Sequence, residues 1–348
     1  MKATALLLAS GLLILAFQNC GKGFNSIDLQ SLESYSSSVP SPSPGPKPAQ
    51  NTINCNPTVQ PTKLSETCLR LAFVEKDNFK EYEPQYPLFS EGASKKRWIY
   101  IPAGKQIDTS NPDEWVFPTG TIIWKEFSVG NAKIETRQLR KIIDGFGLAS
   151  WDFKVYLWRT DQSDADLYDL TALNYNSVPA QYAISQISST YSLIPKESCV
   201  ACHRGSKDVV LGFNYLQLSD STKNSWLSTA GNQLMTKLWT SPDVIPGSAL
   251  DKDTIGYIQS NCATCHSPLG TAAASLNFLH LSTSTSLADE NIMKSALQRS
   301  SLIVNGNPDA STLYLRVLNG SMPSRSLIPY KISDSSAPTK IRSWILSL

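Results

Sequence analysis

The stretch Asn261-Cys262-Ala263-Thr264-Cys265-His266 holds two cysteines three positions apart with a histidine directly after them. A second copy of this CxxCH pattern stands earlier, at Cys199-Val200-Ala201-Cys202-His203. The whole chain has three histidines and two of them follow a CxxC pair, so chance is a poor explanation. One helical turn brings both thiols of a copy to the same side. The spacing predicts one covalently bound haem c at each copy, with His203 and His266 as iron ligands.

Two other kinds of site also use CxxC pairs. Two pairs can close a four-cysteine zinc site, but such a site needs no histidine after each pair. The 59 residues between Cys202 and Cys262 also exceed the usual zinc-ribbon gap of about 15–20 residues. A thioredoxin-type dithiol would be expected once, at a strand-to-helix junction. Two haem c groups are therefore the preferred interpretation, with zinc and a redox dithiol as alternatives.

The composition bounds the class of protein. The chain has 348 residues, of which 41% are hydrophobic, enough for two domains with cores and a linker. Lys and Arg number 31 against 29 Asp and Glu, so the charge gives no reason to expect nucleic acid as a partner. No apolar run reaches the roughly 18–20 residues that a membrane-spanning helix needs.

The first residues have the pattern of a bacterial secretory signal. Lys2 precedes an apolar stretch over 3–17 that is too short to span a bilayer. The stretch ends at Gln18-Asn19-Cys20-Gly21, which is similar to a lipoprotein signal with Cys20 as the acylated residue. We therefore expect residues 1–19 to be a signal peptide and Cys20 to carry lipid. The lipid would hold the chain on the periplasmic side of a bacterial membrane, which we expect to be the outer membrane. The alternative is an ordinary cleaved signal.

A tether and a disulfide are expected next. Residues 31–50 are rich in Ser and Pro and cannot bury enough apolar surface to fold, so we assign 20–63 as a lipid-anchored linker. Haem c is attached on the oxidising side of a bacterial membrane, where disulfides persist. Cys55 and Cys68 lie 13 residues apart and are predicted to pair. The alternative is two buried thiols.

Residues 64–212 are predicted to form a mainly antiparallel β domain that ends in the first CxxCH motif. Apolar and polar side chains alternate from Trp151 to Leu157, which is the period of a strand. Further strands are expected over 121–127 and 134–143. The many aromatic residues between these strands could line a haem face, although plain sheet core is commoner.

The rest of the chain is predicted to be helical. Residues 213–250 are expected to form a helical connector, with a helix over 225–239. Residues 251–348 are expected to form an all-α domain, in which Asp251 or Asp253 caps a helix that runs into the second motif. A short helix over 312–318 and a final helix with one apolar stripe complete it. The predicted fold class is therefore α+β, with the β domain first and the all-α domain second.

From Cys262 to Leu348 the chain resembles class I c-type cytochromes. The likeness is carried by the second CxxCH motif, by Gly306-Asn307-Pro308-Asp309-Ala310-Ser311-Thr312-Leu313-Tyr314-Leu315-Arg316-Val317 and by Met322-Pro323. In that family a Met-Pro some tens of residues after the CxxCH supplies the sixth iron ligand, and Met322 follows His266 by 56 residues. The resemblance implies that Met322 completes the second haem. The alternative is a core methionine.

The chain from Leu64 onward also resembles a group of bacterial dihaem proteins. The likeness is carried by Leu64-Ser65-Glu66-Thr67, Lys96-Arg97-Trp98-Ile99, Phe117-Pro118-Thr119-Gly120-Thr121, Ile134-Glu135-Thr136-Arg137 and Asp161-Gln162-Ser163-Asp164-Ala165. The β domain is similar to the β-sheet c-type cytochromes of the cytochrome c-prime-beta group, which also place a Pro-x-Gly strand early and the CxxCH at the end of the sheet. That group leaves one face of the iron open. Some members of that group cross-link a lysine to haem, and the resemblance does not assign this role to any particular lysine of the present chain.

The sixth ligand of the first haem is left unassigned by the sequence. No methionine occurs between Met1 and Met235, and both Met235 and Met293 fit core positions. His280 is the one spare histidine. We expect the first iron to be five-coordinate or to hold a weak ligand.

Two functions follow from these assignments. The first is a membrane-tethered periplasmic dihaem c-type cytochrome that carries out electron transfer with periplasmic redox partner proteins. The alternative is a haem enzyme whose open first iron acts on peroxide, nitric oxide or hydroxylamine. The sequence identifies no acid/base pair and hence no catalytic residue, so electron transfer is the preferred interpretation.

Overall fold

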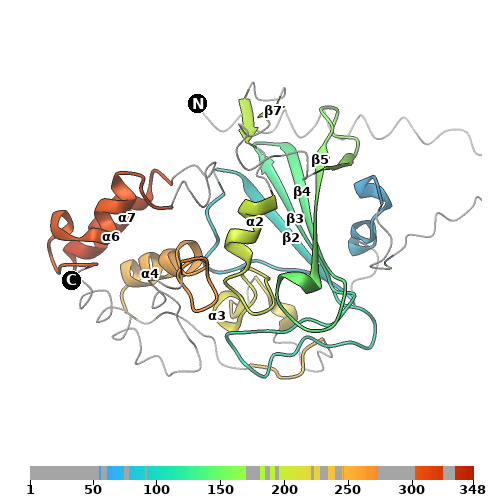
Figure 1. The fold of residues 1–348 in the computed structure, drawn as a ribbon, viewed down its shortest axis with the longest axis horizontal. Coiled ribbons are helices and arrows are strands. Elements are labelled where there is room, and N and C mark those ends of the chain that lie inside the picture. The colour runs from blue at the N-terminus through green and yellow to red at the C-terminus, as the bar shows by residue number, and fades with distance from the viewer. Residues whose placement is uncertain are drawn as a thin grey trace, which may run out of the picture. The chain divides into compact units, whose positions relative to one another are not determined.

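A six-stranded antiparallel sheet forms the centre of the fold, and each strand pairs with the next along the chain (Figure 1). In this computed structural model the strands are β1 (Phe79–Glu81), β2 (Ser94–Tyr100), β3 (Ile122–Val129), β4 (Ala132–Lys141), β5 (Trp151–Trp158) and β6 (Ala165–Tyr168). Antiparallel neighbours can be joined by short turns, so strands that follow one another in the chain also lie next to one another. The structure confirms an α+β fold in which an antiparallel β region precedes helices.

The structure describes residues 55, 61–73, 78–90, 92–169, 181–184, 189–192, 196–220, 223–227, 234–239, 245, 247–272, 302–323 and 334–348. The further elements are η2 (Leu64–Glu66), η3 (Cys68–Phe73), η4 (Leu148–Ser150), β7 (Gln181–Ile184), β8 (Ser189–Ser192), α2 (Lys196–His203), α3 (Tyr215–Leu218), η7 (Ser225–Leu227), α4 (Ala249–Asn261), η9 (Pro308–Ala310), α6 (Thr312–Leu318) and α7 (Ala337–Leu346). The predicted signal peptide, Cys20 and the Ser/Pro-rich stretch lie outside the described residues. Within the described ranges, no helix has the length and hydropathy to cross a bilayer.

The two faces of the sheet pack into separate apolar clusters because side chains alternate along each strand. On one face, Ile99, Ile123 and Leu139 pack with side chains from the segment after α2. On the other face, Trp98 and Trp124 pack with η2 and η3. A shift of one residue would exchange the two faces, so this alternation fixes the strand register. The tryptophans of the sheet are thus core residues, as the commoner interpretation of their density predicts.

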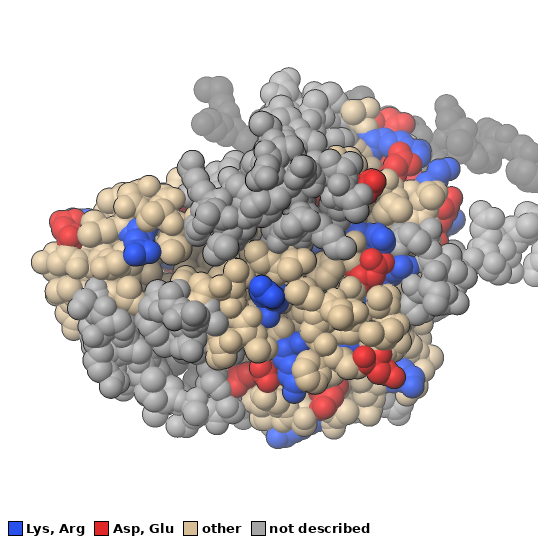
Figure 2. Space-filling model, viewed as in Figure 1, with Lys and Arg blue, Asp and Glu red and all other residues tan. Residues whose placement is uncertain are grey.

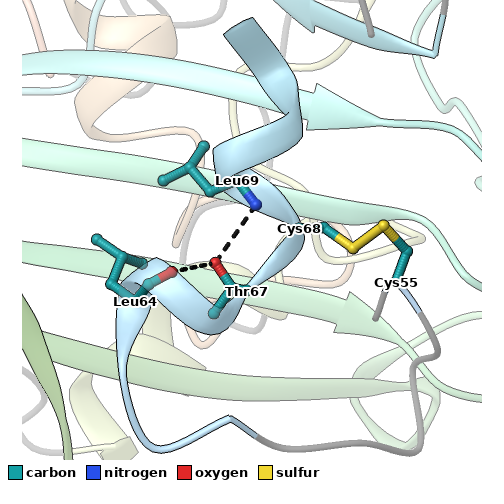
Figure 3. The surroundings of a disulfide bond; sticks show 5 residues. All are labelled: Cys55, Leu64, Thr67, Cys68 and Leu69. Carbon is teal, nitrogen blue, oxygen red and sulfur yellow. Dashed lines mark hydrogen bonds between the residues drawn. A yellow bond between two sulfur atoms is a disulfide. The ribbon is translucent and has the colours of Figure 1, made fainter. Parts of the chain in front are cut away.

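Cys55 and Cys68 form a disulfide at the cluster behind the sheet (Figure 3). Their Cα atoms are 5.2 Å apart, within the usual range for a bridged pair. Next to the bridge, Thr67 Oγ1 donates to the Leu64 carbonyl at 2.7 Å and accepts from the Leu69 N–H at 3.3 Å (Figure 3). The disulfide therefore joins Cys55 to a turn that local hydrogen bonds stabilise.

The second motif stands at the end of a helix that packs on the C-terminal helix. The buried residues of α7, Ile341, Trp344 and Ile345, form the predicted apolar stripe and join a cluster with Ile255 and Ile258 of α4. The residues that follow α4 therefore lie next to this apolar cluster.

The cap of α4 differs from the sequence prediction. Neither Asp251 nor Asp253 is the cap: Ser248 is, and its hydroxyl accepts from the Asp251 N–H at 3.1 Å. The Asp251 carboxylate accepts in return from the Ser248 N–H at 2.8 Å, which completes a capping box. Asp251 also accepts from the Trp344 indole at 2.9 Å and so links α4 to α7.

The helix predicted over 225–239, within the connector 213–250, is wrong in the described part. Only η7 is helical there, and the irregular segment 234–239 lies beside Ile107 and Thr109, with one parallel β-bridge between Ile107 and Met235. Ile107 N donates to the Leu234 carbonyl at 2.8 Å, and the Trp239 indole donates to the Thr109 carbonyl at 2.9 Å. Pairing with a distant extended segment has overridden the local helical preference, which is a weak determinant.

Candidate haem-attachment site

The two CxxCH motifs are in direct contact. The hydroxyl of Thr271 donates to the Ala201 carbonyl at 2.6 Å, and the hydroxyl of Ser267 donates to the Gly205 carbonyl at 3.0 Å. The Cys265 sulfur lies 3.9 Å from the same Ala201 oxygen. The loop that follows the second motif therefore packs along the end of the helix that carries the first.

This close packing depends on Gly205. A Cβ atom at this position would collide with the carbonyl oxygen of Thr264, inside the second motif, and would lie 3.2 Å from Ser267 Oγ. A backbone oxygen cannot rotate away as a side chain can. Glycine is thus the one residue that fits this backbone-to-backbone approach.

The first motif lines a cavity between α2 and the sheet. Cys199, Cys202 and His203 come from the last turns of α2, which lies in front of β2–β4 in Figure 1. Their side chains border a cavity of about 170 Å³, whose apolar walls include Phe127 and Leu139. This volume is below the roughly 300–1,000 Å³ of a typical small-molecule site, so the described walls would enclose only part of a group as large as a porphyrin.

His203 has the hydrogen bonding expected of a proximal iron ligand. Its Nδ1 lies 2.6 Å from the Val209 carbonyl, and its ring meets Phe153 edge-on with centroids 5.3 Å apart. Burial, helped by the positive charge of Lys125, lowers the pKa of the imidazole to about 3, so the ring is neutral. Nδ1–H then donates to the carbonyl and Nε2 keeps its lone pair for a metal. A neutral imidazole with a free Nε2 lone pair is what an iron ligand requires, so His203 fits the role of a haem-iron ligand.

The carbonyl that orients His203 is itself held in an unusual conformation. Val209 has φ +54°, in the left-handed region that β-branched residues rarely adopt. The preceding residue, Asp208, is fully buried and forms an ion pair with Lys141, which is also fully buried. Its carboxylate accepts from the Trp151 indole at 2.7 Å as well. The sheet therefore fixes the loop that aims the Val209 oxygen at the imidazole.

The second motif continues the end of α4. The Cys262 N–H donates to the Ile258 carbonyl at 2.8 Å, and the His266 N–H donates to the Cys262 carbonyl at 2.9 Å. This helical turn keeps both cysteines on one side, as covalent attachment requires, and His266 is buried. Ala263 and Thr264, between the two cysteines, line the cavity of the first motif. Cys262 and Cys265, like Cys199 and Cys202, are thiols and not disulfides.

The other predicted ligands are placed only in part. Met322 follows α6, where it is half-buried and its N–H donates to the Arg316 carbonyl at 3.0 Å. His280 and Met293 lie outside the described residues, and the axial role of Met322 stays a prediction. Met235 is buried in the apolar cluster of the sheet, in agreement with a core position.

The four CxxCH cysteines do not gather into one cluster. Over the described residues, which include all four of these cysteines, no group of three or more His, Cys, Asp or Glu side chains could hold a metal ion. A four-cysteine zinc site requires such a cluster. The described geometry thus gives no support to the zinc alternative.

Comparison of the chain with protein-family models, with curated proteins and with solved structures found no match. The functional argument therefore depends on the residues of the site.

Proposed function

We propose that this chain is a membrane-tethered periplasmic dihaem c-type cytochrome that transfers electrons between redox partner proteins. The observation that carries the proposal is the contact between the two CxxCH motifs, through Ala201 and Gly205 on one side and Thr271 and Ser267 on the other. Groups attached at the two motifs would be neighbours inside one folded unit. Short separation favours electron exchange between them.

The residue roles follow from the chemistry of each side chain. Cys199 and Cys202 attach the first haem and His203 ligates its iron, while the second motif does the same for the other haem. Bound haem supplies a one-electron iron couple. The proposal includes a class I cytochrome c domain over 251–348, with Met322 as sixth ligand. The packing of α7 on α4 supports it, because these helices form the apolar base next to the second motif.

The location is proposed from the sequence and supported by one structural feature. The disulfide between Cys55 and Cys68 suits an oxidising compartment such as the periplasm. Lipid on Cys20 would hold the chain at the membrane through the Ser/Pro-rich linker.

Counting haems tests the proposal. The full chain is produced in a bacterium with haem-attachment machinery, and haem is measured by pyridine haemochrome and by intact mass. We expect two haems per chain, one in the double variant Cys199→Ala/Cys202→Ala, and one in Cys262→Ala/Cys265→Ala. The matched control, Cys55→Ala/Cys68→Ala, removes a cysteine pair without a following histidine and should keep both haems. A wild-type chain without haem would contradict the proposal.

A second function is favoured by the walls of the cavity. Apart from His203, the described residues that line it include no histidine or methionine, which are the usual second ligands of haem iron. A first iron with an exchangeable position could act on a small molecule. Cyanide or nitric oxide added to the oxidised protein distinguishes the two functions. Rapid loss of a high-spin signal indicates an accessible iron and supports the enzyme function. Two low-spin haems without ligand uptake exclude the enzyme function and leave electron transfer as the remaining one.

A further inference from the structure

Three cations stand side by side in the wall of the cavity beside the first motif. The strand register places Arg97 of β2 directly opposite Lys125 of β3, and Lys125 directly opposite Arg137 of β4. Because directly opposite residues share a face, all three side chains point to the same side of the sheet. All three line the cavity that also contains Cys199 and Cys202. We refer to Arg97, Lys125 and Arg137 as the cation row.

The surroundings of the cation row do not neutralise it. Arg137 pairs with the buried Glu135, through Nε–Oε1 at 2.9 Å. Tyr82 and Glu83 act on Arg97 electrostatically, and Cys199 acts in the same way on Lys125. Neither Arg97 nor Lys125 has a side-chain hydrogen bond or ion pair to any other residue that the structure describes. The row thus carries excess positive charge.

This excess is unusual for the molecule. Acidic and basic side chains are interspersed over the described part of the face in Figure 2, in line with a nearly neutral composition. In the cavity wall, by contrast, like charges stand opposite one another, which destabilises a sheet. Arg97 is 6% exposed. Burial, followed by the charges of Arg97 and Arg137, lowers the pKa of Lys125 to about 7. A ligand with negative charge would offset this cost.

We propose that the cation row binds the two carboxylates of the haem attached at Cys199 and Cys202. The inference rests on the proposed function, because the same cavity presents the attaching thiols and the row. In haem, the two propionate side chains lie on the edge opposite the vinyl groups that cysteines attack. Paired, partly buried guanidinium and ammonium groups are strong donors for such carboxylates. The row thus orients the haem plane within the cavity.

The test uses the full haem-loaded chain. Variants Lys125→Met and Arg97→Gln each remove one member of the row, and Lys96→Gln is the matched control, since Lys96 is the exposed neighbour of Arg97 on the opposite face. Haem carrying 13C at the propionate carboxylates gives reduced-minus-oxidised infrared difference spectra. Potentiometric titration gives the two midpoint potentials. Lys125→Arg tests rescue and guards against misfolding of the methionine variant.

The expected result has two parts. Lys125→Met and Arg97→Gln keep two haems but shift the labelled carboxylate band, whereas Lys96→Gln and Lys125→Arg leave it near the wild-type position. One midpoint potential falls by about 59 mV, which is a tenfold change in a one-electron reduction equilibrium. The potential falls because a carboxylate without its cation leaves uncompensated negative charge near the iron, which disfavours the reduced state.

Four results would overturn the inference. A potential that falls without any band shift means that the charges act only through space. A band and potential that stay unchanged, with nitrite or phosphate shifting the wild-type spectrum but not that of the variants, means that the row binds a free anion. If the variants keep two haems and neither the carboxylate band nor the potentials change, the cation row has only a structural role. A wild-type chain without haem overturns this inference and the proposed function together, so the haem count separates the two failures.

Discussion

The two CxxCH motifs have the same residue pattern but are built in different ways. The first, on α2, depends on distant parts of the chain: its histidine is oriented by Val209, and the loop of Val209 is held by Lys141 of the sheet. The second stands at the end of α4 and depends mainly on neighbours in sequence and on helix packing. One CxxCH pattern can thus be held in place by buried charges or by local helical structure.

The largest expected effect tests whether buried charge holds the first motif. Asp208→Asn leaves Lys141 charged and without a counter-ion in a fully buried site. We expect the free energy of unfolding to fall by about 3–5 kcal/mol, measured by urea unfolding of the full chain. Asp253→Asn is the control, because its ion pair with Lys340 at 2.6 Å is exposed, and it should cost at most about 1 kcal/mol. Equal losses would remove the distinction between the motifs.

The next effect concerns the contact between the motifs. Gly205→Ala places a methyl group against the Thr264 carbonyl, and we expect a loss of about 2–3 kcal/mol in the free energy of unfolding. Ser267→Ala removes only the hydrogen bond to the Gly205 carbonyl and should cost about 1 kcal/mol. Unfolding of both variants in urea gives the comparison. A Gly205→Ala chain as stable as the wild type would show that the motifs can separate freely.

A smaller effect tests the local construction of the second motif. Ser248→Ala removes the cap of α4 and should lower the free energy of unfolding by about 1 kcal/mol. Ser336→Ala is the matched control, because Ser336 begins α7 without a side-chain cap bond. Calorimetric unfolding of both variants checks this. Equal effects would mean that the capping box contributes little to α4.

The smallest effect is a pH dependence in α4, the helix that leads into the second motif. Burial, and next the charge of Asp334, raise the pKa of Tyr257 in α4 above its ordinary 10.0. Above pH 10 the unfolded state has lost a proton that the folded state keeps, so stability falls as pH rises. Tyr257→Phe should remove about 0.5–1 kcal/mol of the loss between pH 10 and 11, after allowance for partial exposure. Parallel pH profiles for variant and wild type would contradict this.

The sequence predicted the locally determined parts and missed those that depend on tertiary structure. The strand from Trp151, the short helix over 312–318 and the stripe of α7 follow from periodicity, and the structure has them. Both CxxCH motifs were found from spacing alone. Their contact was not, because it depends on how the chain folds over the intervening residues.

The missed residues of the site have no local pattern. Lys141 and Asp208 are 67 positions apart, and each is an ordinary charged residue in its own segment. Lys125 stands between Trp124 and Glu126 in a strand, where the alternation does not show which face covers a cavity. The register that aligns Arg97, Lys125 and Arg137 appears only when three strands are paired. A search for basic residues at alternating strand positions could have suggested them.

The disulfide between Cys55 and Cys68 has a mechanical consequence. Tension applied to the chain ahead of Cys55 passes through the covalent bridge to Cys68, which packs in the cluster behind the sheet with Trp98 and Trp124. The intervening twelve residues are bypassed and carry no load. Pulling therefore acts first on the packing of Cys68 and Leu69 against Trp98 and Trp124, whereas in a reduced chain it would act first on the residues between Cys55 and Cys68.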